Sequence, residues 1–347
     1  MKNCRVQIHF LLGPAGSGKT HRCLAEIRTA LARSPAGAPL LFLAPKQATF
    51  QLERQLLAED SLQGFTRLKI LSFERLARFV CERLGQAPPP MLDEEGRLMV
   101  LRALLARRRE ELKLFRASAR LTGFASELSR ALREFQRQRL TPDDLLKLAD
   151  DARDTVGLSL KLQDLALLLR DYLDWLAAHG LQDADGLLEV ATKRLGETFN
   201  IQHSTFNIQE LWLDGFAEFA PSELELLAAV AAHCGRVTIS LCLDQAPQKN
   251  TAGLSNWALA AKTFEDTRQR LAELPGAEIS QEKLERHPEK NRFADNPVLA
   301  HLEKSWAEPS AISNFEFRIL NFTGAAAAAQ PSTQPSTVFR TAPLPPA

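Results

Sequence analysis

An uninterrupted match to the phosphate-loop pattern G-x-x-x-x-G-K-[ST] at residues 13–20 constrains this chain more than any other feature. An apolar, β-rich run precedes it at residues 6–12, and apolar residues recur at helical spacing over residues 21–31. A strand, a glycine loop and a helix in this order are the context that such a loop requires. The sequence therefore predicts a phosphate-binding turn, and the alternative is a glycine turn that simply begins a helix.

The residue types in this match suit phosphate chemistry. Glycines at positions 13, 16 and 18 permit backbone angles and close contacts that side chains would block, so that backbone N–H groups can converge on phosphate oxygens. The positive end of the following helix favours an anion. We expect Lys19 to bridge the β- and γ-phosphates and Thr20 to hold Mg²⁺. The predicted cofactors are ATP and Mg²⁺, and the predicted nucleotide-binding residues are Gly13, Pro14, Ala15, Gly16, Ser17, Gly18, Lys19 and Thr20.

Strand and helix patterns alternate through the first part of the chain, which predicts an α/β fold with a parallel sheet. Further strands are expected at residues 40–45 and 68–73, each followed by a helical pattern. A leucine-rich stretch without any strand pattern follows, with helices expected at residues 94–108, 125–137, 142–150, 159–179 and 184–195. Buried-strand patterns then return at residues 210–216 and 236–244, around a helix at residues 222–233. We expect these two strands to join the first sheet, so that the helical stretch is an insertion.

The signal weakens towards the C-terminus. Helices are expected at residues 258–274 and 297–306, and a strand at residues 315–322. An alanine run and a proline-rich end follow, a composition that cannot bury a core and predicts disorder. The predicted sheet domain consists of two parts, residues 1–90 and residues 201–250, with a helical insertion between them at residues 91–200. A connection is expected at residues 251–323, and a disordered tail at residues 324–347.

Composition excludes several classes of protein. The net charge of +1 over 347 residues provides no global field, so any DNA contact must come from local patches. The five cysteines include no C-x-x-C pair, which argues against a zinc site, an iron–sulfur cluster in this chain or a disulfide framework. We expect a reduced, cytoplasmic protein without a membrane association, because neither a signal peptide nor an apolar run of ~18 residues is apparent.

An acidic residue, Asp214, follows the apolar part of the predicted strand at residues 210–216. A carboxylate at this position can be a second Mg²⁺ ligand opposite Thr20. An acid after a buried strand is also common without any metal. Gly215 stands where hydrolysing helicases of this architecture usually place a glutamate that orients water, and Glu218 lies four residues beyond Asp214. ATP binding is therefore better supported than ATP hydrolysis.

Two segments have the residue types of nucleic-acid contacts. In the turn after the second strand, Lys46, Gln47 and Thr49 can donate to phosphates and Phe50 can stack on a base. The alternative is an ordinary turn with Phe50 in the core. Residues 91–140 carry twelve Lys or Arg against seven Asp or Glu, a local net charge of +5. This segment contains the Arg107–Arg109 cluster and one helical face with Arg130, Arg133 and Arg137, for which a solvated surface is the plainer interpretation.

These features together resemble the N-terminal region of the B subunit of the bacterial AddAB (RexAB) helicase–nuclease family. The resemblance covers about residues 5–323, and its more particular parts are the Pro-Lys-Gln-Ala-Thr-Phe turn at residues 45–50 and the Trp-Leu-Asp-Gly-Phe strand at residues 212–216. Further matching segments lie at residues 10–20, 70–77, 161–168 and 296–303.

The resemblance implies a P-loop NTPase fold that is RecA-like and superfamily 1 helicase-like, interrupted by a helical subdomain. It also implies a heterodimer with an A subunit that supplies the helicase motor and one nuclease, acting on single- and double-stranded DNA during double-strand break repair. In the family the B subunit resembles an inactivated helicase, with Asp-Gly in place of Asp-Glu, as at Asp214 and Gly215 here.

Family members are about three times longer and end in a nuclease domain with an iron–sulfur cluster, which this sequence lacks. We therefore expect a truncated or frame-shifted gene, or the end of a gene model, with residues from about 324 onward non-native. A stand-alone P-loop ATPase or phosphotransferase acting on a small molecule is the alternative function. A non-enzymatic scaffold that holds ATP only for stability is a third possibility.

Overall fold

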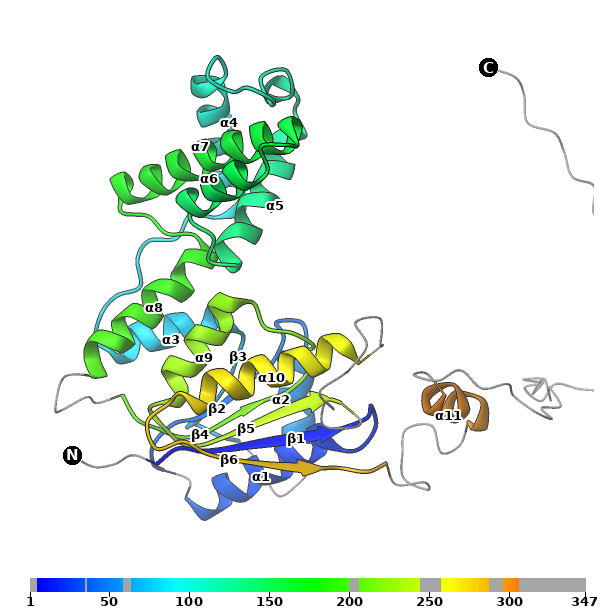
Figure 1. The fold of residues 1–347 in the computed structure, drawn as a ribbon. Helices are drawn as coiled ribbons and strands as arrows, with labels where there is room; N and C mark the ends of the chain where they lie inside the picture. Colours follow the sequence, from blue (N-terminus) through cyan, green and yellow to red (C-terminus); the bar gives the residue numbers. More distant parts are fainter. Residues whose placement is uncertain are drawn as a thin grey trace, which may run out of the picture. The chain divides into compact units, whose positions relative to one another are not determined.

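The structure is a computed structural model that describes residues 5–34, 36–58, 64–199, 206–243, 257–286 and 296–305. Within these ranges the chain forms a six-stranded sheet in the order β3-β2-β4-β5-β1-β6, and every pair of neighbours is parallel (Figure 1). The strands are β1 (Gln7–Gly13), β2 (Leu40–Leu43), β3 (Leu68–Leu71), β4 (Ile208–Leu213), β5 (Cys234–Cys242) and β6 (Glu278–Lys283). The predicted parallel α/β sheet is confirmed, because β4 and β5 lie between β2 and β1.

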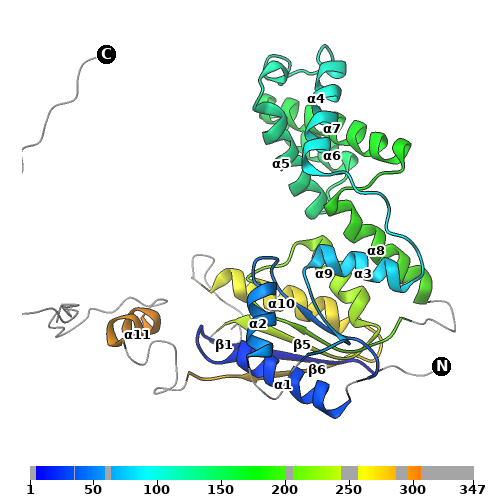
Figure 2. The same ribbon diagram turned by 180° about the vertical axis from the view of Figure 1, so that it is seen from behind.

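Helices cover both faces of this sheet, as the two opposite views show (Figures 1 and 2). One face packs against α1 (Lys19–Arg33) and α2 (Thr49–Leu57). The other face packs against α3 (Phe73–Arg83), α8 (Ala184–Phe199), α9 (Pro221–Ala231) and α10 (Ala258–Ala272). In β1, Phe10 and Leu12 join the second cluster while Leu11 joins the first. A strand buried on both faces explains the continuous apolar run in the sequence.

The predicted all-helical segment contains a core of its own. The helices are α4 (Glu94–Arg108), α5 (Phe124–Arg137), α6 (Pro142–Asp151) and α7 (Val156–His179), with a 3₁₀ turn at Ser118–Arg120. Their buried residues form a cluster that includes no residue of the sheet. Thr141 caps α6, and its hydroxyl and Asp144 form a capping box. Helix α7 begins three residues before the predicted Ser159.

Two adjacent crossings connect the insertion to the sheet domain. Met91 and Gln182 form a parallel bridge, with Leu92 N–H donating to the Gln182 carbonyl at 2.7 Å and Gln182 N–H donating to the Pro90 carbonyl at 3.0 Å. After this bridge, α8 buries Leu187 and Ala191 in the cluster that covers the sheet. The last helix of the predicted insertion therefore packs with the sheet domain.

Strand β6 was not predicted from the sequence. This edge strand pairs with β1 and reads Glu-Ile-Ser-Gln-Glu-Lys, with only one apolar residue. A polar edge strand is ordinary, because one side of it faces solvent, and it leaves no apolar pattern to detect. The predicted helix at residues 297–306 is observed as α11 (Pro297–Lys304), whereas the predicted strand at residues 315–322 and the tail lie outside the described residues. No described helix is long and apolar enough to cross a bilayer.

Candidate functional site

The predicted phosphate loop lies between the end of β1 and the start of α1 and has geometry that requires glycine. Gly16 and Gly18 have φ angles of 79° and 88°, a region that side chains disfavour. A Cβ added to Gly13 would lie 2.5 Å from both the Leu284 carbonyl oxygen and the Ser17 hydroxyl. Each of the three glycines is thus needed for conformation or space.

The ammonium group of Lys19 is held above this loop. Its Nζ donates to the carbonyl oxygens of Gly13 at 2.7 Å and Pro14 at 2.8 Å. The loop itself is closed by a hydrogen bond of 3.2 Å from the Ser17 N–H to the Pro14 carbonyl. The Lys19 ammonium group therefore contacts the loop that joins β1 to α1.

Thr20 and Asp214 meet at the carboxyl edge of the sheet. Asp214 directly follows β4, which is separated from β1 only by β5. The Thr20 hydroxyl donates to Asp214 Oδ2 at 2.5 Å. The Asp214 side chain is buried, and its backbone N–H donates to the Leu43 carbonyl at 3.1 Å. The loop hydroxyl and the acid predicted to face it are therefore in direct contact.

Two further residues, which the sequence analysis did not identify, lie at this site. Ser240 in β5 donates its hydroxyl to Asp214 Oδ1. Arg286, just beyond β6, donates Nε–H to the carbonyl of loop residue Ala15 at 3.0 Å. The Leu284 N–H also donates to the Leu12 carbonyl at 2.7 Å, so the segment after β6 lies along the loop. Arg286 was not predicted because β6, the strand that brings it to Ala15, was not predicted.

The residue after Asp214 is conformationally restricted. Gly215 has a φ angle of 85°, and a Cβ there would approach Pro45 Cδ at 3.3 Å, so a glutamate would be strained at this position. Glu218 is exposed and lines a different cavity of about 310 Å³ with residues of α9 and α10. Neither position places a carboxylate beside Lys19.

The turn that was predicted to contact nucleic acid is exposed. The Ala48 N–H donates to the Pro45 carbonyl at 2.8 Å, and the Thr49 hydroxyl donates to the Lys46 carbonyl at 3.1 Å. Lys46 and Gln47 are exposed. Phe50 is 69% exposed and belongs to neither cluster that packs on the sheet, so the core alternative for this side chain is wrong. The turn presents donors and an aromatic ring to solvent.

The arginines of the insertion differ in how they are paired. Arg107, Arg108 and Arg109 form ion pairs with nearby carboxylates, Arg108 through two hydrogen bonds to Asp171 at 2.6 and 3.0 Å. Arg130 is largely exposed and pairs with Glu127 at 3.2 Å. Much of the local positive charge is therefore paired with carboxylates of the insertion itself.

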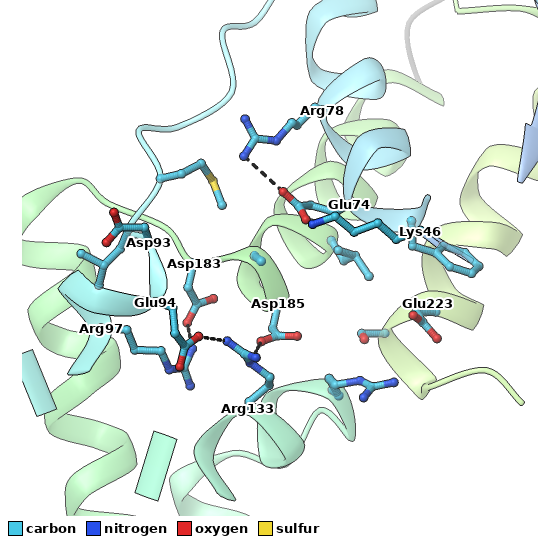
Figure 3. A pocket seen from close by; sticks show the side chains of 17 residues that line it. Lys46, Glu74, Arg78, Asp93, Glu94, Arg97, Arg133, Asp183, Asp185 and Glu223 are labelled. Atoms are coloured by element: carbon cyan, nitrogen blue, oxygen red, sulfur yellow. Dashed lines mark hydrogen bonds and ion pairs between the residues drawn. The ribbon is translucent and has the colours of Figure 1, made fainter. Parts of the chain in front are cut away.

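Three of the predicted DNA contacts line one cavity of about 570 Å³, namely Lys46, Arg133 and Arg137. Its walls come from α4 and α5 of the insertion, from α3, α8 and α9, and from the turn before α2 (Figure 3). Arg133 lies between Glu94 and Asp185, forms an ion pair with each, and its Nε is 3.2 Å from Asp185 Oδ2 (Figure 3). No hydrogen bond or ion pair is found for the Arg137 side chain among the described residues. Lys46 and Arg137 are therefore the cations of this cavity that form no ion pair with a carboxylate in the described part of the chain, although the charge of Arg137 acts against the rise in the pKa of Asp185 and of Glu223.

A buried ionic network forms part of the wall of this cavity. Arg97 and Asp183 form an ion pair of 2.6 Å with side chains only 2% and 3% exposed, and Tyr172 donates its hydroxyl to Asp183 at 2.9 Å. Burial and the nearby charge of Asp183 raise the pKa of Asp185 to about 6, against the opposing effect of Arg133. The cavity therefore contains a carboxyl group that is easily protonated.

The fold and this site define a class of protein: an α/β protein whose parallel sheet carries a G-x-x-x-x-G-K-T loop at its carboxyl edge, with an acidic residue two strands away. Comparison with known families identifies the member more closely. A family described as "ADDB, N-terminal" matches residues 10–303, and the chain belongs to this family.

Individual relatives are named as the B subunit of an ATP-dependent helicase/deoxyribonuclease. The one from Desulforudis audaxviator is 40% identical over 308 residues, which are 87% of this chain and 25% of the relative. The one from Pelotomaculum thermopropionicum is 41% identical over 70% of this chain and 21% of the relative. The one from Bacillus cereus is 31% identical over 92% of this chain and 27% of the relative. The chain thus spans about a quarter of the length of these relatives.

Proposed function

We propose that this chain is the N-terminal region of the B subunit of an ATP-dependent helicase/deoxyribonuclease that processes double-strand DNA breaks for recombinational repair. The family match over residues 10–303 and the names of the relatives support the B-subunit role. The partner would be an A-type helicase–nuclease subunit. Because the matched region is about a quarter of each relative, we attribute the nuclease activity to sequence outside this region.

Within this region the proposed activity is ATP binding with Mg²⁺, in a site of the P-loop NTPase type. The observation that carries this proposal is the contact between Thr20 and Asp214. It lies beside a loop in which a side chain has no space at residue 13 and is disfavoured by the positive φ angles of Gly16 and Gly18. A Cβ at Gly13 would fill the turn, which fits a cradle for phosphate oxygens.

The residues present fit both groups. Backbone N–H groups of the loop, which Pro14 cannot contribute, and the Lys19 ammonium would hold the phosphates, and Thr20 and Asp214 would hold Mg²⁺. Bound ATP would supply the negative charge that these donors attract, and Mg²⁺ would neutralise part of it. The role of Lys19 and of the loop is to bind and orient.

We infer that hydrolysis is slow. General-base or water-orienting chemistry needs a carboxylate near the terminal phosphate, but residue 215 is a glycine with a φ angle of 85° and Glu218 lines another cavity. Bound ATP would then act by stabilising the arrangement of β1, β4 and β5 around the loop.

DNA contact is proposed for the cavity side of the sheet domain, through Lys46 and Arg137, and for the exposed ring of Phe50. A phosphate backbone can approach cations that form no ion pair with a carboxylate, and single-stranded bases can stack on an exposed aromatic ring. Arg133 would have to leave Glu94 and Asp185 before it could bind phosphate.

The test of this proposal is binding of single-stranded DNA to the full chain over a range of salt concentrations. For each phosphate contact we expect the slope of log affinity against log salt to change by about 0.7. Lys46→Ala and Arg137→Ala should each reduce the slope by roughly this amount. Arg153→Ala is the matched control, because Arg153 is 74% exposed in the turn between α6 and α7 and pairs with Asp150.

Affinity that does not depend on salt, or that falls equally in the Arg153 variant, would contradict the DNA contact. Either result would favour the alternative function, a stand-alone P-loop ATPase or phosphotransferase that acts on a small molecule. Co-purification of the chain with an A-type subunit tests the B-subunit role separately, and its failure would leave the nucleotide-binding proposal standing.

A further inference from the structure

Both oxygens of the Asp214 carboxylate accept a hydrogen bond from a hydroxyl group. Thr20 at the start of α1 donates to Oδ2 at 2.5 Å, and Ser240 donates to Oδ1 from within β5. The two hydroxyls approach from different elements, one from the loop helix and one from the neighbouring strand. The carboxylate is thus held between them.

The two donors differ in rigidity. Ser240 is 3% exposed, and its strand is hydrogen-bonded to β4 on one side and to β1 on the other, where it pairs with Leu11. Thr20 lies in the first turn of α1, at the end of the loop, and is not part of the sheet. Backbone pairing to Leu43 fixes the Asp214 main chain, but the carboxylate can still rotate about its side-chain bonds. Ser240 is the anchor that removes this freedom.

We propose that Ser240 is a positioning residue, which holds Asp214 Oδ1 so that Oδ2 faces the Thr20 hydroxyl and the divalent cation site. This inference rests on the proposed nucleotide function. A charge-assisted hydrogen bond to a buried carboxylate is strong enough to select one orientation. Without it, Asp214 would remain in place but its carboxylate plane could rotate, and the cation would lose a pre-oriented ligand.

The plainer alternative is that Ser240 is only a satisfied polar group in the sheet. Thr238 allows the two to be separated, because it lies two residues earlier on the same face of β5 and is 1% exposed. Its hydroxyl has no hydrogen-bond partner among the described residues. This strand therefore accommodates a buried hydroxyl that does not contact Asp214, which provides a matched control on the same element.

The experiment measures the affinity of the full chain for a fluorescent ATP analogue, with Mg²⁺ and with a chelator, in four proteins. These are the wild type, Ser240→Ala, Ser240→Thr and Thr238→Val. The ratio of the two affinities within each variant reports the contribution of Mg²⁺ and is insensitive to the fraction of protein that is folded. In Ser240→Ala we expect this ratio to fall about tenfold, the weight of one hydrogen bond to a charged group, with chelator affinity unchanged.

Ser240→Thr retains the hydroxyl and should recover most of the ratio, and Thr238→Val should match the wild type. An unchanged ratio in Ser240→Ala, or an equal fall in Thr238→Val, would overturn the positioning role. If Ser240→Thr does not fold, the contrast between Ser240→Ala and Thr238→Val decides alone. A wild-type chain whose nucleotide affinity does not respond to Mg²⁺ would instead overturn the Mg²⁺ site itself, and with it this inference.

Discussion

The hydroxyl of Thr20 and the carboxylate of Asp214 are 2.5 Å apart, although the two residues are separated by 194 positions in the chain. The intervening segment leaves the sheet after α3 and returns through α8, and its entry and exit are bridged between Met91 and Gln182. The insertion can therefore form its own core without disturbing the register of β2, β4, β5 and β1. The site depends on sheet topology, and several consequences can be measured.

Replacing Lys19 should remove most of the nucleotide affinity. In Lys19→Ala the loop loses the cation that now contacts the Gly13 and Pro14 carbonyls, and we expect affinity for an ATP analogue to fall at least about tenfold. Lys69→Ala is the control, since Lys69 is an exposed lysine on β3. Equilibrium binding measures both, and unchanged affinity in Lys19→Ala would refute the site assignment.

Breaking the buried ion pair should strongly destabilise the protein near the junction. Asp183→Asn leaves Arg97 in a site where its side chain is 2% exposed, and removing one partner of such a pair costs about 3–5 kcal/mol. Chemical denaturation followed by circular dichroism measures the effect. Asp150→Asn, at a carboxylate that is 65% exposed, should change stability by no more than about 0.5 kcal/mol. Equal losses in both variants would show that burial does not govern the cost.

Asp185 should make the protein less stable as the pH rises. Its pKa is about 6 in the folded protein, above the ordinary value of 3.8, so the folded state binds the proton more tightly than the unfolded state does. The free energy of unfolding should therefore fall between about pH 4 and pH 6 and remain lower above that range, by an amount of order 3 kcal/mol.

In Asp185→Asn this contribution to the pH dependence should disappear, and stability at pH 7 should equal or exceed that of the wild type. Denaturation at a series of pH values provides the measurement, with Asp154→Asn as the control at an exposed carboxylate. A wild-type slope retained by Asp185→Asn would contradict the assigned pKa.

The insertion core should be separable from the proposed nucleotide site. Leu168 is fully buried in the cluster formed by α4–α7, and Leu168→Ala should cost about 2–5 kcal/mol of stability. Because this cluster contains no residue of the sheet, ATP affinity under native conditions should be unchanged. Leu148→Ala, at a leucine that is 44% exposed on α6, is the control. A matching loss of ATP affinity in Leu168→Ala would show that the two cores are coupled.

Much of the sheet was predictable from local patterns. The runs that became β1, β2 and β4 are apolar because each strand is buried on both faces, and that pattern survives in the sequence. The glycines of the loop were predictable for a similar reason, since only one residue type tolerates their backbone angles. The strand β6 was not predictable, because an edge strand is stabilised by its pairing with β1 and not by its own side chains.

Local sequence patterns were sufficient to predict the glycine loop at residues 13–20, its flanking strand and helix, and the helical character of residues 94–179, because each depends on residues close together in the chain. The distant groups that contact those residues became known from the three-dimensional arrangement of the strands and helices. Ser240 reaches Asp214, Arg286 reaches Ala15, and Lys46 lines one cavity with Arg137, because parallel strands bring their carboxyl ends together and α8 returns to the sheet. Such contacts leave no periodic signal, since neither partner is placed by its neighbours in sequence.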